Sequence, residues 1–152
     1  MRTRRAYRSN RGFPMYEQDS RRPVDDRLLQ QAIKKATWHF AHNRDEYKRV
    51  FRRRVTRHLR CKPSAVHFDD LSASLRRIRA AVLADADEKT YGWTNGYQIY
   101  VSRSVPMAFD ELVGTLVHEE LHCFCFARGR WLGSKTEHGC MKALGERPEY
   151  CK

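Results

Sequence analysis

The sequence predicts an α+β domain in which helices pack around a small β-sheet or hairpin. Apolar residues recur at helical spacing over residues 25–60, 69–82 and 106–129. Between the second and third segments, aromatic and β-branched residues flank the turn signal Asn95-Gly96, which is typical of a β-hairpin. With 152 residues, the chain is long enough to bury one hydrophobic core.

The first helical segment is expected to begin at Asp25 or Asp26, because acidic residues favour the positive end of a helix dipole. It should continue to about Arg60, with a candidate break at His42-Asn43. Its second half has one basic side and one apolar side. The residues of the apolar side are Tyr47, Val50, Phe51, Val55, His58 and Leu59.

After this helix, residues 65–68 are expected to be extended. Asp69 or Asp70 should then cap a second helix, whose apolar positions continue to Val82. In the hairpin, residues 91–94 and 97–101 should pair around a two-residue turn.

The C-terminal part of the chain is expected to hold two more helices. One should start near Pro106 and stop at Gly129, a residue suited to a helix end. The last should cover residues 138–144 and stop at Gly145.

Charge is distributed unevenly along the chain. Residues 1–60 contain 18 Lys or Arg and 6 Asp or Glu, whereas residues 61–152 contain 12 of each. Guanidinium groups bind phosphates in a bidentate manner, so this asymmetry indicates a nucleic-acid partner, with DNA favoured, over a merely solvated helix face. Two segments should carry the binding: a basic arm of residues 1–22, and a helix face. The residues of that face are Arg49, Arg52, Arg53, Arg57 and Arg60.

Cysteine usage favours an intracellular, reducing compartment such as the nucleus or cytoplasm. Cysteines stand at positions 61, 123, 125, 140 and 151, an odd number without a C-x-x-C pair. The N-terminal residues lack the apolar stretch of a secretory signal, and no apolar run is as long as a membrane span. No membrane association is therefore expected.

The third helical segment contains His118-Glu119-Glu120-Leu121-His122. Histidines four residues apart lie one turn apart on the same helix face, so both imidazoles can reach one metal ion. This is the H-E-x-x-H arrangement of zinc metalloproteases, in which Glu119 would act as general base. The alternative is a pair of buried, hydrogen-bonded histidines, but two His and two Glu on an apolar helix are costly without a function.

A catalytic zinc usually has three protein ligands, and the third ligand here must come from elsewhere in the chain. His138 is the best candidate, because it is the only histidine after the motif and glycines between it and His122 allow the chain to fold back. Cys140 is the second candidate, and Glu146 would make a glutamate-type site. The weaker candidates are Glu137, Cys123 and Cys125.

Part of the chain resembles the SprT-like metalloprotease family, which includes the Spartan repair proteases. The matching segments are Ile99-Tyr100-Val101-Ser102, then Leu112-Val113-Gly114-Thr115-Leu116-Val117-His118-Glu119-Glu120-Leu121-His122, then His138-Gly139 and Cys140-Met141-Lys142-Ala143-Leu144. In that family a His followed by Gly supplies the third zinc ligand, so the resemblance supports His138. It implies a zincin-like metalloprotease core over residues 23–152, and a zinc peptidase that acts on proteins bound to DNA.

These observations lead to a zinc-dependent metallopeptidase of SprT-like type, acting on protein or peptide substrates associated with nucleic acid. Residues 97–101 could pair with an extended substrate, and Tyr97, Tyr100 and Arg103 are candidate oxyanion donors. The rival hypothesis is a nucleic-acid-associated structural protein of a larger assembly such as a virion, in which the zinc fold is retained without proteolysis.

Overall fold

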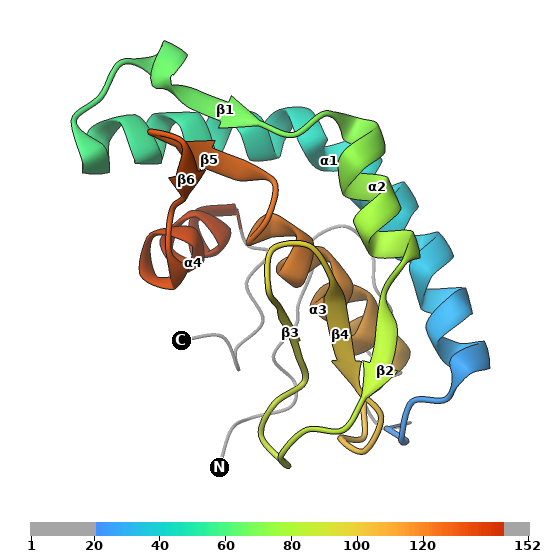
Figure 1. Ribbon diagram of the computed structural model, residues 1–152. Helices are drawn as coiled ribbons and strands as arrows, with labels where there is room; N and C mark the ends of the chain where they lie inside the picture. The colour runs from blue at the N-terminus through green and yellow to red at the C-terminus, as the bar shows by residue number, and fades with distance from the viewer. Residues whose placement is uncertain (1–20, 145–152) are drawn as a thin grey trace.

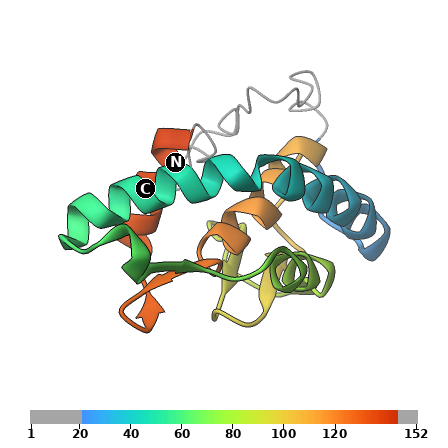
Figure 2. The same cartoon turned by 90° about the horizontal axis from the view of Figure 1, so that it is seen from above.

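A computed structural model describes residues 21–144 and confirms the α+β class (Figure 1). A long helix, α1 (Asp26–Leu59), runs along the described part of the molecule. Helix α3 (Phe109–Leu121) lies between α1 and a three-stranded sheet, as the view from above shows (Figure 2). Sandwiched in this way, α3 is buried along almost its whole length.

Helix α1 begins as predicted and is not broken. Asp25 caps it, and the Asp25 side chain accepts a hydrogen bond from the Leu28 backbone N–H at 2.8 Å. The candidate break at His42-Asn43 is wrong. The side chains of both residues donate to main-chain carbonyls one turn earlier, at 2.8 Å each, and this satisfies them without interrupting the helix.

The predicted apolar side of α1 is buried except at its C-terminal end. Tyr47, Phe51 and the more N-terminal Phe40 surround the ring of Phe124, with ring centroids 5.0–6.4 Å apart. His58, which was assigned to the apolar side, is exposed. This aromatic cluster joins α1 to the chain segment that follows α3.

Helix α2 (Leu71–Arg79) follows a 3-10 turn (Pro63–Ala65) and strand β1 (Val66–Phe68). Asp70 caps α2, since its side chain accepts from the Ala73 N–H at 2.8 Å. The sequence predicts that this helix continues to Val82, but it ends at Arg79. Val82 instead begins strand β2 (Val82–Ala84), which pairs in parallel with β4.

The main sheet has the order β2-β4-β3, with β3 (Gly92–Thr94) and β4 (Ile99–Ser102) antiparallel. The hairpin is confirmed, but its two-residue turn is wrong. Thr94 pairs with Ile99, so residues 95–98 form a four-residue loop. The side-chain oxygen of Asn95 accepts hydrogen bonds from the backbone N–H groups of Tyr97 and Gln98, both at 2.9 Å. Gly96 takes a φ of 95°.

A second hairpin follows α3, which ends at Leu121 rather than near Gly129. Strand β5 (Cys125–Ala127) pairs with β1 and with β6 (Arg130–Trp131). Arg128 and Gly129 form the turn between them with φ values of 54° and 77°, so Gly129 is a hairpin residue and not a helix stop.

The last helix, α4 (Ser134–Leu144), begins one turn before the predicted start at His138. The backbone N–H of Glu137 donates to the Gly133 carbonyl at 3.1 Å, which closes the first turn. The expected stop at Gly145 lies outside the described residues. Within residues 21–144, no helix combines the length and apolarity needed to cross a membrane.

Two residues of the predicted basic arm are fixed against the start of α3. Arg22 and Met107 exchange backbone hydrogen bonds at 2.9 and 3.2 Å. The guanidinium of Arg21 pairs with the buried carboxylate of Glu111 at 2.9 Å, and Glu111 also accepts from the Ala108 N–H. The Arg21 guanidinium is therefore engaged within the fold. Residues 1–20, which carry the other arginines of the arm, lie outside the described residues.

Candidate metal centre

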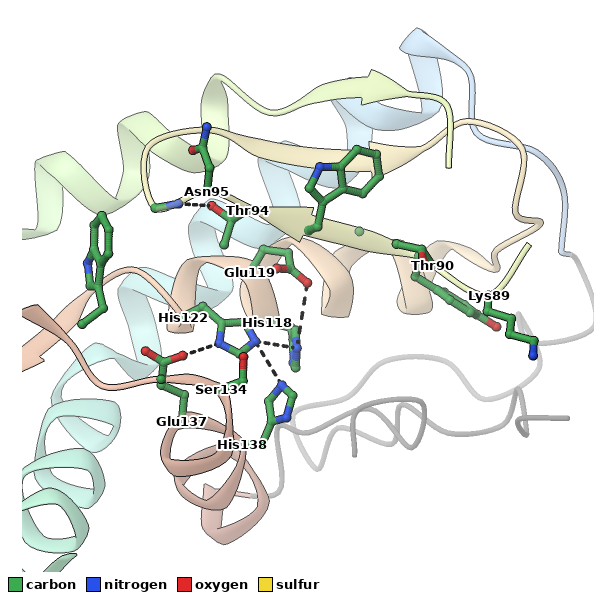
Figure 3. Close-up of a pocket in the computed structure, with 16 residues that line it drawn as sticks. Lys89, Thr90, Thr94, Asn95, His118, Glu119, His122, Ser134, Glu137 and His138 are labelled. Carbon is green, nitrogen blue, oxygen red and sulfur yellow. Dashed lines mark hydrogen bonds and ion pairs between the residues drawn. The ribbon is translucent and has the colours of Figure 1, made fainter. Parts of the chain in front are cut away.

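Helices α3 and α4 bring three histidines to one point (Figure 3). His122 Nε2 lies 3.1 Å from His118 Nε2 and 3.1 Å from His138 Nε2. The ligand atoms of all three lie within 4.8 Å of one another. His118 and His122 come from adjacent turns of α3, and His138 comes from α4, which packs against both α1 and α3. This cluster could hold a metal ion.

The donor set fits zinc. Two nitrogens bound to one tetrahedral zinc at about 2.0–2.1 Å lie about 3.4 Å apart. This is close to the 3.1 Å that separates His122 Nε2 from Nε2 of each of the other two histidines. The Nδ1 of His122 lies 2.6 Å from the carboxylate of Glu137, which fixes the proton on Nδ1 and leaves Nε2 as the lone-pair donor. Imidazole also suits copper, iron and nickel, so the donor set by itself does not define the metal.

Glu137 is the residue whose role the sequence analysis missed. The sequence offers Glu137 only as a candidate metal ligand, whereas its carboxylate in the structure contacts Nδ1 of His122, itself a candidate ligand. Burial alone would lower the pKa of His122, whereas the hydrogen bond that its Nδ1–H donates to Glu137 and the charge of Glu119 raise the pKa above its ordinary value. In the sequence, this role is indicated only by the position of Glu137 directly before His138. The packing of α4 against α3 brings Glu137 to His122.

Glu119 lies at the edge of the histidine cluster. Its carboxylate is 3.9 Å from His118 Nε2 and only 6 % of the residue is exposed. Burial raises the pKa of Glu119 to about 7, with the nearby carboxylate of Glu137 acting in the same direction and His122 opposing it. A carboxylate with this pKa can accept and release a proton near neutral pH.

The neighbouring glutamate of the motif has a structural role. Glu120 is fully buried and accepts two hydrogen bonds from the Arg77 guanidinium, at 2.7 and 2.8 Å. Burial alone would lower the pKa of Arg77, but Glu120 and Asp69 raise it above its ordinary value. The motif thus directs one carboxylate to the histidines and the other to α2.

A cleft of about 560 Å³ opens onto the histidines and Glu119. One wall is strand β3 with its flanking residues, and the other is the region of Trp131 and the first turns of α4. Gly92 allows β3 to approach α3. A Cβ at this position would lie 2.7 Å from Thr115 Cγ2 and 3.6 Å from Glu119 Cγ.

The prediction that residues 97–101 pair with an extended substrate is wrong. Residues 99–102 form the central strand β4, whose two sides are occupied by β2 and β3. Among the described residues, β3 has no pairing partner on its outer side, so β3 is the strand that could accept an extended chain. Tyr97, Tyr100 and Arg103 do not line the cleft, so the structure does not support them as oxyanion donors.

Among the described residues, the candidate cysteines are not part of the histidine cluster. Cys140 is buried in the core, and burial raises the pKa of its thiol to about 11. Cys123 bonds to Thr94 and to the Glu119 carbonyl, and burial raises the pKa of its thiol to about 12. Cys125 lies in β5, where it pairs with Phe68 of β1, and Glu146 lies outside the described residues.

The predicted basic face of α1 borders two grooves. Arg49, Arg52 and Arg53 line one groove beside Pro63. Arg57 and Arg60 line a different groove, against α4. Nucleic-acid binding by these five arginines stays a prediction.

Comparison of the chain with protein-family models, with curated proteins and with solved structures gave no match. Functional assignment accordingly depends on the chemistry of the site.

Proposed function

We propose that the chain is a zinc-dependent metallopeptidase of SprT-like type, with a zincin-like core. The observation that carries this proposal is the convergence of His118, His122 and His138 in a cleft that Glu119 also lines. A purely structural zinc site is usually closed by four protein ligands. Here three histidines converge beside a carboxylate suited to proton transfer, which favours catalysis.

The roles of the chain's own groups follow from their positions. His118, His122 and His138 would hold zinc, which when bound supplies a Lewis acid that polarises a carbonyl and lowers the pKa of water. Glu119 would take a proton from the attacking water and deliver it to the leaving amine. Its carboxylate lies beside the three histidines, 3.9 Å from His118 Nε2, which suits this role.

A protein or peptide substrate suits the walls of the cleft. The free edge of β3 could pair with an extended backbone by strand addition. Trp131 lines the cleft and is 40 % exposed, and Tyr97 packs edge-on against it. Exposed aromatic side chains beside a cleft are typical of sites that bind apolar side chains of a partner.

The test combines metal content with proteolysis. The wild-type chain should bind one zinc and cleave unfolded casein or itself, with or without nucleic acid. Glu119→Gln should keep the zinc and the fold but lose cleavage, because it cannot accept the proton. Glu88→Gln, an exposed carboxylate outside the cleft, is the matched control and should retain activity.

Two outcomes would contradict the proposal. Turnover by Glu119→Gln equal to that of wild type would exclude this glutamate as the base. A wild-type protein that holds zinc but cleaves no faster than Glu119→Gln would favour the rival function, a nucleic-acid-associated structural protein with a retained zinc fold.

A further inference from the structure

A second concave surface, the α1/α4 groove, lies between the C-terminal end of α1 and the first turns of α4. It has a volume of about 430 Å³. Its lining residues are Arg54, Arg57, His58, Arg60, Lys135, Thr136 and Gly139. The metal cleft uses Ser134, Glu137 and His138 of the same helix, so by helical spacing the groove and the cleft lie on opposite faces of α4.

The α1/α4 groove concentrates positive charge. Among residues 21–144, no Asp or Glu lines it. Across residues 21–144, the side chains of Arg54, Arg57, Arg60 and Lys135 form neither an ion pair nor a hydrogen bond. The Arg54 guanidinium lies across α4 instead, with Nη2 3.7 Å from the position of a Cβ on Gly139.

Fold stability does not explain this arrangement. Like charges three residues apart on a helix, such as Arg54 with Arg57, destabilise it by about 0.2–0.5 kcal/mol per pair. The negative end of the α1 dipole favours cations, but the facing end of α4 is positive and disfavours Lys135. The cations therefore repel one another and the α4 terminus unless an anion occupies the groove.

We infer that the α1/α4 groove binds consecutive phosphates of a nucleic-acid backbone. Guanidinium forks match phosphate oxygens, and the ammonium of Lys135 adds a point charge from the opposite wall. The groove of Arg49, Arg52 and Arg53, which Asp45 also lines, adds further cations along α1. Residues 48–60 of α1 extend over about 18 Å, along which one nucleic-acid strand presents about five phosphates. A single phosphate ion would reach only one groove.

This binding is independent of the proposed peptidase, so it is measured on the full-length Glu119→Gln protein. The probe is a short fluorescein-labelled oligonucleotide, single-stranded or duplex, and the readout is fluorescence anisotropy between about 50 and 200 mM salt. Arg54→Gln with Arg57→Gln should weaken binding by about tenfold per arginine near 0.1 M salt, and should reduce the log–log salt slope by about two. Lys135→Glu should also weaken binding.

The matched control is Arg76→Gln with Arg79→Gln, which removes two exposed charges from α2, away from α4. Circular dichroism of each variant verifies the fold. Equal losses in the groove and control variants would overturn the inference, because net charge alone would then explain binding. Displacement of the oligonucleotide by polyglutamate at equal charge would also overturn it and indicate an acidic protein partner.

Discussion

Replacing Glu137 should weaken zinc binding although Glu137 is not one of the three histidine ligands. Its carboxylate lies 2.6 Å from Nδ1 of His122 and only 3 % of the residue is exposed. Water can therefore hardly replace it, and the imidazole would lose the group that fixes its orientation and tautomer. Glu137→Gln keeps an acceptor but loses the charge, whereas Glu137→Ala leaves Nδ1 without this partner.

The expected magnitude follows from this difference. Removal of such a partner typically lowers metal affinity about 10–100-fold, or about 1.4–2.7 kcal/mol. Glu137→Gln should lie near the lower value and Glu137→Ala near the upper one. Glu137 also raises the pKa of His122, so protons compete with the metal more strongly in the wild type at acidic pH. Measurement near pH 8 largely removes this competition.

The assay is competition with a chromophoric zinc chelator, and Glu88→Gln serves as the exposed control. Zinc dissociation constants should rise in the order wild type, Glu137→Gln, Glu137→Ala. Below about pH 6.5 the difference in zinc dissociation constant between wild type and variants should narrow, because the wild type also loses zinc affinity as His122 is protonated. Identical constants for all variants near pH 8, with the fold retained, would refute a ligand-orienting role for Glu137.

Three further predictions concern the framework around the site. Gly92→Ala should cost about 1–3 kcal/mol in urea unfolding, because its Cβ would lie 2.7 Å from Thr115 Cγ2, and an unchanged unfolding midpoint would contradict this contact. Arg77→Ala should lower the free energy of unfolding by about 3–5 kcal/mol, because Glu120 is then left buried and unpaired. The double variant Arg77→Met with Glu120→Met should recover most of this loss, and an effect of Arg77→Ala below about 1 kcal/mol would argue against the buried pair. In the metal-free protein, burial raises the folded-state pKa of Glu119 from 4.5 to about 7, so this group should lower the free energy of unfolding by up to about 3 kcal/mol as pH rises between these values. Burial raises the pKa of Glu120 to about 7 as well, so Glu119→Gln should reduce the slope of the curve without abolishing it, and an unchanged slope would refute the assignment.

The parts of the fold that the sequence predicts well are those set by local periodicity. The caps at Asp25 and Asp70, the buried stripe of α3 and the β3–β4 hairpin all depend on residues within a few positions of one another. His118 and His122 share a face for the same reason.

The parts that it predicts poorly depend on contacts between distant segments. Val82 fits a helical pattern, but pairing with β4 places it in a strand. The Arg128-Gly129 turn lacks the usual Asn-Gly signal, and the apolar residues after His122 imitate a continued helix. The role of Glu137 requires α3 and α4 to meet. Which groove each arginine of α1 lines depends on where α4 covers α1.

The length of α1 has a consequence for how the molecule can be divided. Its 34 residues extend over about 51 Å, and it contacts α2, α3 and α4 along that length. The segment of residues 99–144 contains the three histidines and Glu119, but the apolar side of α3 is covered by α1. A fragment that starts after α1 would expose this surface to water and should aggregate instead of folding. The smallest autonomous unit that can be expressed or transplanted with the histidine cluster therefore includes α1, and proteolysis within α1 should abolish folding of the metal centre.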